Sequence, residues 1–189
     1  MRDVTIEIES LTPYSSSRYL EQSLEKGETL DAHERRRWRE KLHTDENGNV
    51  FVPGVAFKLA LDEAAKLRNE KIKGKGNQTY TRIFTTGVSA ISDLPLGINQ
   101  DRVKSVTIPA HADGQRGSGP RVPRIFPIIP TWGGKIEMRV FNDSLPEEIF
   151  ERFFAEAGIF SGVGRGRPSM GCPMGLGRFK PVQFTWTEH

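Results

Sequence analysis

The sequence predicts a single α+β domain, and three observations support this fold class. First, 189 residues fit one domain, which can bury roughly 70% of its unfolded surface. Second, short stretches that alternate apolar and polar residues, as strands do, are interspersed with stretches of helical spacing. Third, Cys172 is the only cysteine, which excludes an internal disulfide framework and a cysteine-rich zinc site, so a packed core must hold the fold.

The N-terminal part of the chain predicts a strand, a solvated helix, a short strand and a strong helix. These elements are residues 4–8, 29–43, 49–52 and 54–68. The last of them places Phe57, Leu61 and Ala64 on one face, which indicates packing against a core. It begins at Pro53-Gly54, where the extended run stops.

The C-terminal part predicts further strands around a second strong helix. Strands are expected at residues 80–91, 124–129, 135–141 and 179–186, and a helix at residues 145–157. Ser144-Leu-Pro-Glu147 resembles a capping box at the start of that helix, Gly158 its stop, and Gly87 a bulge. Residues 93–124 contain prolines and a glycine cluster, so they are expected to be irregular and either functional or disordered.

Without two insertions, a helical one at residues 17–47 and a long loop at 93–124, the order is strand, helix, strand, strand, helix, strand. This is the ferredoxin-like (RRM-like) β-α-β-β-α-β palm, an antiparallel sheet with both helices on one face. The fold hosts many functions. In its RNA-binding members, the free sheet face or the loops around it hold the nucleic acid.

The net charge of +3 is unevenly distributed along the chain. Residues 1–65 hold 9 Lys plus Arg and 13 Asp plus Glu, a balance of −4, whereas residues 66–189 hold 18 and 11, a balance of +7. This asymmetry favours a polyanionic partner. A soluble domain with an uneven surface is the alternative.

A glycine-rich segment, residues 158–177, contains seven of the 19 glycines, Arg165 and Arg167, and no acidic residue. Glycine amides can approach a phosphate chain closely, so Gly162 and Gly164 are candidate RNA contacts together with Arg165, Arg167 and Arg178. A Walker loop is excluded because no Gly-Lys-Ser/Thr follows. The alternative is a tight or mobile loop between a helix and the last strand.

Two more basic clusters complete the predicted RNA-binding set. They are Lys71, Lys73 and Lys75 in a lysine loop, and Arg116, Arg121 and Arg124 in the long insertion. Singly, each is typical of a solvated surface. Together, three clusters with few acidic neighbours suggest a shared track for a single-stranded polyanion, whose binding should weaken steeply with salt.

The sequence offers little catalytic chemistry. The four histidines do not form metal-ligand pairs with a cysteine, so no metal or other cofactor is expected, and Cys172 is expected to pack without reacting. His43 and His33 are the runner-up catalytic candidates, as general bases for RNA cleavage without a metal. Residues 1–10 have no apolar segment typical of a signal peptide, so a soluble, cytoplasmic protein is expected.

Two stretches resemble the RAMP superfamily of CRISPR-associated proteins, above all its guide-RNA-binding backbone subunits. Residues 45–61 (DENGNVFVPGVAFKLAL) resemble the family's Pro-Gly helix start, and residues 157–179 (AGIFSGVGRGRPSMGCPMGLGRF) its terminal glycine-rich stretch. The resemblance implies a palm that holds RNA, an insertion at 93–124 acting as a thumb, and guide contacts at Lys58 and the glycine-rich loop.

The resemblance further implies a non-catalytic subunit that oligomerises along a guide RNA and presents it to target RNA or DNA beside other effector-complex subunits. The chain departs from the family's pattern at one position. Cleaving backbone subunits carry an Asp upstream of the Pro-Gly, where this chain has Arg35-Arg-Arg-Trp-Arg39. Two alternatives remain: an endoribonuclease that processes CRISPR RNA, and a stand-alone or phage-encoded mimic that acts by protein contacts.

Overall fold

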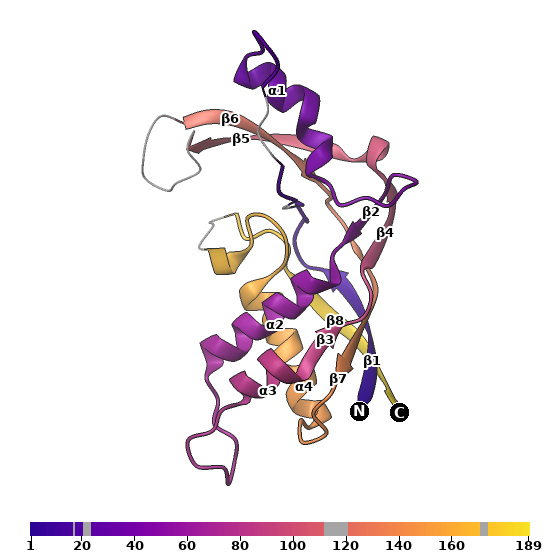
Figure 1. Cartoon of the computed structure of the whole chain (residues 1–189), viewed down its shortest axis with the longest axis vertical. Helices are drawn as coiled ribbons and strands as arrows, with labels where there is room; N and C mark the ends of the chain where they lie inside the picture. Colours follow the sequence, from indigo (N-terminus) through magenta and orange to yellow (C-terminus); the bar gives the residue numbers. More distant parts are fainter. Residues whose placement is uncertain (17, 21–23, 112–120, 171–173) are drawn as a thin grey trace.

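The computed structural model describes residues 1–16, 18–20, 24–111, 121–170 and 174–189. At its centre lies an antiparallel sheet with the strand order β3-β7-β1-β8 (Figure 1). The strands are β1 (Arg2–Ser10), β3 (Val88–Ala90), β7 (Gly133–Val140) and β8 (Phe179–Glu188). Two helices connect them, α2 (Gly54–Arg68) after β1 and α4 (Glu147–Glu156) after β7. This is the predicted ferredoxin-like palm.

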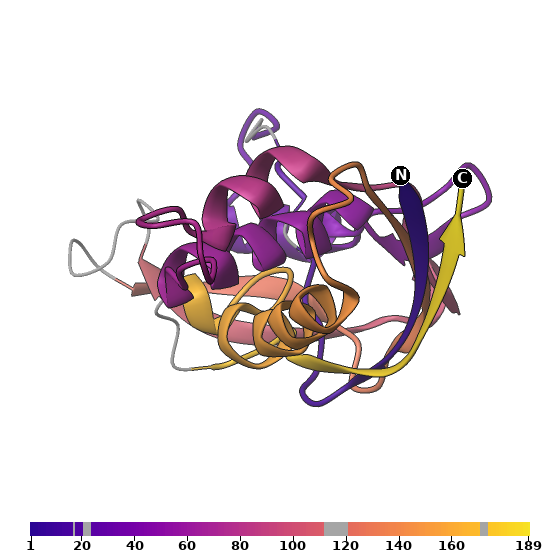
Figure 2. The same ribbon diagram turned by 90° about the horizontal axis from the view of Figure 1, so that it is seen from below.

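The helices cover one face of the sheet, and the core lies between them and the strands (Figure 2). Strand β1 turns Val4, Ile6 and Ile8 into this core at every second position, as its alternating sequence predicts. Helix α4 contributes Phe154, whose ring centroid lies 5.4 Å from that of Phe179 on β8. The two insertions are therefore built onto a palm that has its own apolar core.

The first insertion forms helix α1 (Leu30–Arg37) and the 3-10 turn η1 (Trp38–Lys41), and the second forms strands. Strand β2 (Asn49–Val52) pairs with β4 (Leu94–Asn99), and after the turn η2 (Gln100–Arg102) strand β5 (Lys104–His111) pairs with β6 (Arg121–Ile128). The β5–β6 hairpin extends beyond the palm, next to α1 (Figure 1). The expectation of an irregular segment at 93–124 was wrong for its described residues.

The prolines in this segment suggested a loop. They lie instead at positions of a two-stranded ladder that can accommodate proline. Pro109 of β5 and Pro123 of β6 lie opposite each other in the antiparallel register. A ladder of only two strands has outer edges where a proline removes no paired amide. The prolines are therefore compatible with a regular hairpin.

The strand expected at residues 80–91 is mostly a helix, α3 (Tyr80–Gly87), followed by the short β3. Tyr80, Phe84 and Gly87 are buried at helical spacing, and this face outweighed the strand propensity of the threonines. Thr86 donates its hydroxyl proton to the Arg82 carbonyl at 2.8 Å, a bond that helices accommodate. Gly87 is thus the end of a helix and not a bulge.

Helix α4 also differs from its prediction at both ends. Pro146 is its N-cap, and the Ser144 hydroxyl bonds to the Asn142 side chain at 2.6 Å, so no capping box forms. At the other end the helix continues through a π-helical turn, η3 (Ala157–Ser161), past the expected stop at Gly158. A Cβ on Gly158 would lie 2.2 Å from the Phe179 carbonyl oxygen, so this glycine allows close approach to β8.

Candidate nucleic-acid interface

The glycine-rich loop after η3 is tightly packed against the start of the chain. Gly177 and Gly164 both adopt positive φ angles, 71° and 78°. A Cβ on Gly177 would lie 1.8 Å from the Val163 carbonyl oxygen, and one on Gly164 would lie 2.4 Å from the Ser15 carbonyl oxygen. Both positions therefore require glycine for backbone conformation and for packing.

Five amides of this loop donate to carbonyls inside the protein. Gly162 donates to Ala157, Val163 to Gly177, Arg165 to Ser15, Leu176 to Gly166 and Gly177 to Pro13, at 2.8–2.9 Å. Gly162 and Gly164 are also buried. The structure does not favour the expected backbone cradle, in which these two glycines touch phosphate. The loop instead presents arginine side chains from a rigid frame.

Arg165 brings this loop to the hairpin. Its guanidinium carbon lies 3.9 Å from the centroid of the Phe126 ring on β6, and the Lys41 ammonium of η1 lies 4.5 Å from the same centroid. These are cation–π distances. Arg165 is exposed, whereas Phe126 is buried. Three segments that are far apart in sequence thus meet at one aromatic ring, with an arginine at the surface.

Glu34 of α1 fixes this meeting point from inside. Its carboxylate accepts hydrogen bonds from the Lys41 ammonium at 2.6 Å, Arg124 at 2.9 Å and the Ile125 amide at 2.9 Å. Burial opposes its ionisation, but these donors outweigh burial and hold the pKa of Glu34 below its ordinary value. The side chain of Arg124 is only 14% exposed. The structure places this predicted RNA contact in a buried ion network.

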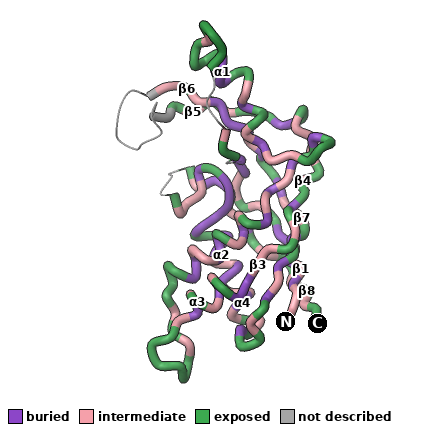
Figure 3. Tube along the Cα trace, viewed as in Figure 1, coloured by how far each residue is buried: buried purple, intermediate pink, exposed green. Residues whose placement is uncertain are grey.

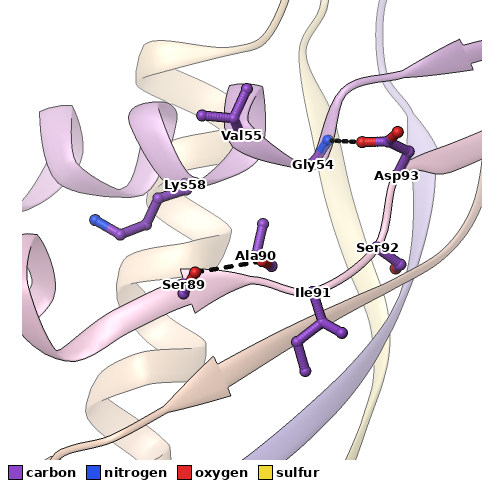
Figure 4. A pocket seen from close by; sticks show the side chains of 8 residues that line it. All are labelled: Gly54, Val55, Lys58, Ser89, Ala90, Ile91, Ser92 and Asp93. Carbon is purple, nitrogen blue, oxygen red and sulfur yellow. Dashed lines mark hydrogen bonds between the residues drawn. The ribbon is translucent and has the colours of Figure 1, made fainter.

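Lys58 lines a small pocket beside the start of α2. The pocket, about 200 Å³, lies between Gly54, Val55 and Lys58 on α2 and residues 89–93 (Figure 4). The Lys58 ammonium bonds to Asp62 one turn later, at 2.5 Å.

The Asp93 carboxylate in the same pocket accepts the Gly54 amide at 2.8 Å. A carboxylate therefore already occupies the anion-binding position at this helix end. A Cβ on Gly54 would lie 2.1 Å from the Ser92 carbonyl oxygen, so the Pro-Gly pair serves packing here.

The lysine loop lies apart from these groups. Lys71, Lys73 and Lys75 are exposed on the segment between α2 and α3, at the opposite end of α2 from Gly54 (Figures 1 and 3). Among the described residues, Lys73 and Lys75 have no carboxylate within ion-pair distance, and the Lys71 ammonium donates to the Asn77 side chain. A single shared track would require the lysine loop to lie next to the loop that carries Arg165. The two are separate in the structure (Figure 1).

The remaining predicted contacts fall into two groups. The side chain of Arg167 is anchored in its loop by Ser169 and the Gly164 carbonyl, and that of Arg178 by the Ile159 carbonyl. Arg116 and the side chain of Arg121 lie outside the described part of the chain, as does Cys172.

The histidines differ in their suitability for catalysis. His33 is buried, with Nδ1 3.1 Å from Glu28, which fits a structural role. Burial lowers the pKa of His43, and the charge of Arg18 acts in the same direction, so this imidazole is neutral at pH 7 and could accept a proton. Over the described residues, no group of three or more His, Cys, Asp and Glu side chains could hold a metal ion.

The open face of the sheet has little in common with an RNA-binding face. Strands β1, β3, β7 and β8 contain no exposed aromatic residue, and Phe184 and Trp186 of β8 pack against the core. Outward positions carry Glu7 opposite Lys135, together with Glu137. RNA-binding sheets of this architecture stack bases on exposed aromatics. The candidate interface is therefore the loops and the hairpin, and not the sheet.

Sequence reasoning missed three residues of this region. Lys41 and Glu34 were read as parts of a solvated helix, and no local signal could show that they reach β6. Phe160, on η3, was read as part of a glycine-rich loop, although it is 62% exposed. A large apolar residue inside an arginine-rich and glycine-rich stretch was the available signal.

Comparisons with known proteins support the fold. No protein-family model matches the chain, and a search of curated protein sequences finds no match. Among solved structures, the chain is similar to a chain of the Type III-B Cmr-beta complex bound to cognate target RNA, with a TM-score of 0.52 and 16% identity. The match covers 98% of this chain and 60% of that one.

A Cas6 product complex also matches, with a TM-score of 0.34 and 14% identity, over 96% of this chain and 51% of that one. A TM-score below 0.5 does not by itself indicate a shared fold. The Cmr-beta match shows a likeness of fold, and it agrees with the fold that the sequence predicts. Among the described residues, no helix has the length and apolar character needed to cross a bilayer.

Proposed function

We propose that the chain is a non-catalytic RNA-binding subunit that assembles with copies of itself along a CRISPR guide RNA. It presents this RNA to target RNA or DNA, next to other subunits of an effector complex. The observation that carries the proposal is the convergence at Phe126, where hairpin, helical insertion and glycine-rich loop meet and leave Arg165 at the surface. The fold likeness to a chain of an RNA-bound Cmr-beta complex supports it.

The geometry fits recognition of an RNA backbone without reading of its sequence. Arg165 is held on an aromatic ring, and Arg167 and Arg178 are bonded to loop atoms, so little side-chain freedom would be lost on binding. Contacts of arginine with phosphates position a strand and are independent of base identity. A subunit that repeats along a guide needs this kind of contact, because each copy meets a different sequence.

The test is a titration of labelled single-stranded RNA at several salt concentrations, with EDTA present. The parent should bind with an affinity that falls as salt rises. Arg165→Ala should weaken binding and reduce the logarithmic salt slope by about 0.7, the value for one phosphate of a single strand. Arg35→Ala is the matched control, because Arg35 is an exposed arginine of α1 that pairs with Asp31 at 2.8 Å.

Three results would contradict the proposal. If the parent does not bind RNA, or binds it independently of salt, the proposed contacts with the RNA backbone are contradicted. RNA cleavage in EDTA that His43→Ala abolishes would favour the endoribonuclease alternative. A monomer that stays monomeric with RNA and binds only other protein subunits would favour the mimic. The proposal expects multimers that carry intact RNA and absorb at 260 nm, as judged by size-exclusion chromatography.

A further inference from the structure

An exposed apolar patch lies beside the candidate interface, on the π-helical turn η3 and the 3-10 turn η4 (Pro168–Met170). These two elements pack against each other. Phe160 is 62% exposed, Ile159 44% and Met170 58%. Exposed apolar side chains are common singly, but three of them on two adjoining turns make this region a candidate site of interaction.

Cations accompany this patch along the chain. Residues 157–180 contain Arg165, Arg167, Arg178 and Lys180 and no Asp or Glu. The Arg178 Nε donates to the carbonyl of Ile159 at 3.0 Å, which fixes its guanidinium next to the residue that precedes Phe160. Arg167 belongs to the turn that leads to Met170, whose amide donates to the Arg167 carbonyl at 3.2 Å.

The backbone that carries Phe160 is held in place on both sides. The Gly162 amide closes the turn by donating to the Ala157 carbonyl at 2.8 Å. Gly158 packs so closely on β8 that a Cβ would lie 2.2 Å from the Phe179 carbonyl oxygen. The ring is therefore exposed on a rigid support, and it would lose little freedom on binding a partner.

We propose that Phe160 stacks on an unpaired base of single-stranded RNA while Arg178 and Arg167 contact the neighbouring phosphates. The inference rests on the proposed function and adds a recognition mode to it. Aromatic rings interleaved with cations are the usual means of binding single strands, because every base offers a flat face and every nucleotide a phosphate. The positive surroundings favour this polyanion over a second copy of the chain.

Base stacking gives the exposed Phe160 ring a role that phosphate binding by the loop amides would not explain. Five of the loop amides, those of Gly162, Val163, Arg165, Leu176 and Gly177, donate to protein carbonyls and are not available to phosphate. An exposed ring flanked by arginines recognises the same strand through its bases. Because stacking tolerates every base, it also suits a strand of arbitrary sequence.

The test compares Phe160→Ala, Phe160→Tyr and the parent on ordinary single-stranded RNA and on a strand of equal length with abasic sites. Phe160→Ala should weaken binding to ordinary RNA about tenfold or more, the usual effect of losing one stacked base, without changing the salt slope. Phe160→Tyr retains the ring and should bind like the parent. On the abasic strand, Phe160→Ala and the parent should bind equally.

Phe141→Ala is the matched control, because Phe141 is also an exposed phenylalanine, 53% exposed, and directly follows β7, outside the glycine-rich loop. It should leave RNA binding unchanged. Circular dichroism and the unfolding midpoint of each variant show that the fold is intact.

The outcomes separate this inference from the proposed function. If the parent binds RNA and Phe160→Ala binds it equally well, the stacking role is overturned and the proposed function stands. The same holds if the abasic strand shows the full loss, or if Phe160→Ala changes the oligomeric state without RNA, which would make the patch a contact between copies. If the parent binds no RNA, the proposed function itself fails.

Discussion

At the scale of single residues, the glycine-rich loop shows that one sequence pattern can serve different physical needs. Glycines such as Gly164 and Gly177 permit a positive φ and a close approach between two chain segments. Glycine-rich phosphate loops use the same properties, but they leave amides free for the ligand. Here five of the loop amides donate to protein carbonyls and hold the loop together. We therefore expect its function to reside mainly in the side chains that it presents.

Gly177→Ala should destabilise the protein strongly. The new methyl group would have to displace the Val163 carbonyl, and the residue would be held at a φ of 71°, so we expect a loss of about 3 kcal/mol in the free energy of unfolding. Urea denaturation measures it. Gly74→Ala is the control, because Gly74 has a φ of 77° but no atom within 4 Å of its added Cβ.

The control should lose only about 1 kcal/mol, the cost of the left-handed conformation alone. Equal losses in both variants would show that close packing around Gly177 does not contribute.

At the scale of elements, the hairpin and the helical insertion are joined through one buried carboxylate. Glu34 of α1 bonds to Lys41 of η1 and to Arg124 and Ile125 of β6. The Lys41 ammonium also donates to the Ile125 carbonyl at 2.7 Å. Because Arg124 and Ile125 directly precede Phe126, this network fixes the position of the Phe126 ring. The ring in turn positions Arg165 of the glycine-rich loop, which lies over it.

Glu34→Gln should lower stability and flatten its dependence on acid pH. At pH 7 we expect a loss of about 3 kcal/mol, because the cations of a buried pair lose their partner. The pKa of Glu34 is lowered in the folded protein, so its stabilisation is complete above the ordinary pKa of 4.5 and is lost as the pH falls through the folded value. The variant should lack this part of the acid-induced loss.

Urea unfolding between pH 7 and pH 3 measures both effects. Glu40→Gln is the control, because the side chain of Glu40 is 47% exposed in its pair with Arg37 and should contribute less than about 1 kcal/mol. If the acid dependence of Glu34→Gln equals that of the parent, the network does not depend on the charge of Glu34.

At the scale of the whole molecule, the positive charge is concentrated at one end of the palm. Residues 66–82 contain six Lys plus Arg and one Glu, a balance of +5, so the rest of the chain carries −2 of the total of +3. Glu70, the one acid, pairs with Arg68 and Arg152. The lysine loop is thus a strongly positive surface at the far end of α2 from the Pro-Gly start.

Replacing Lys71, Lys73 and Lys75 together by Ala should weaken binding of long single-stranded RNA but not of short RNA. Helix α2 has 15 residues and spans about 22 Å, so a short strand that occupies the Arg165 region would not reach the loop. Affinities for a length series of RNA measure the effect, and Lys135→Ala on the open sheet face is the control.

Stability should change by less than about 0.5 kcal/mol, because the three side chains are exposed. Equal weakening for every RNA length would place the lysine loop and the Arg165 region in one site.

The periodicity of the sequence predicted the palm because its elements have clear local signals. Strand β1 alternates strictly, and α2 and α4 each carry one apolar face, so their type and order follow from the chain alone. The same reasoning failed at α3, where threonines suggested a strand. It failed also at β5 and at the first residues of β6, where prolines suggested a loop, whereas the strand expected at residues 124–129 matches the rest of β6. In both cases packing outweighed weak local preferences.

The sequence by itself determined that the chain builds a ferredoxin-like palm with an excess of positive charge in its later part. Only the tertiary structure decided which charges are available to a ligand. Arg124 and Lys58 are paired with carboxylates, five amides of the glycine-rich loop are bonded to carbonyls, and Phe160 is exposed. Local periodicity records which side of an element faces the core, whereas a partner such as Glu34 for Arg124 lies 90 residues away, so only the folded chain shows it.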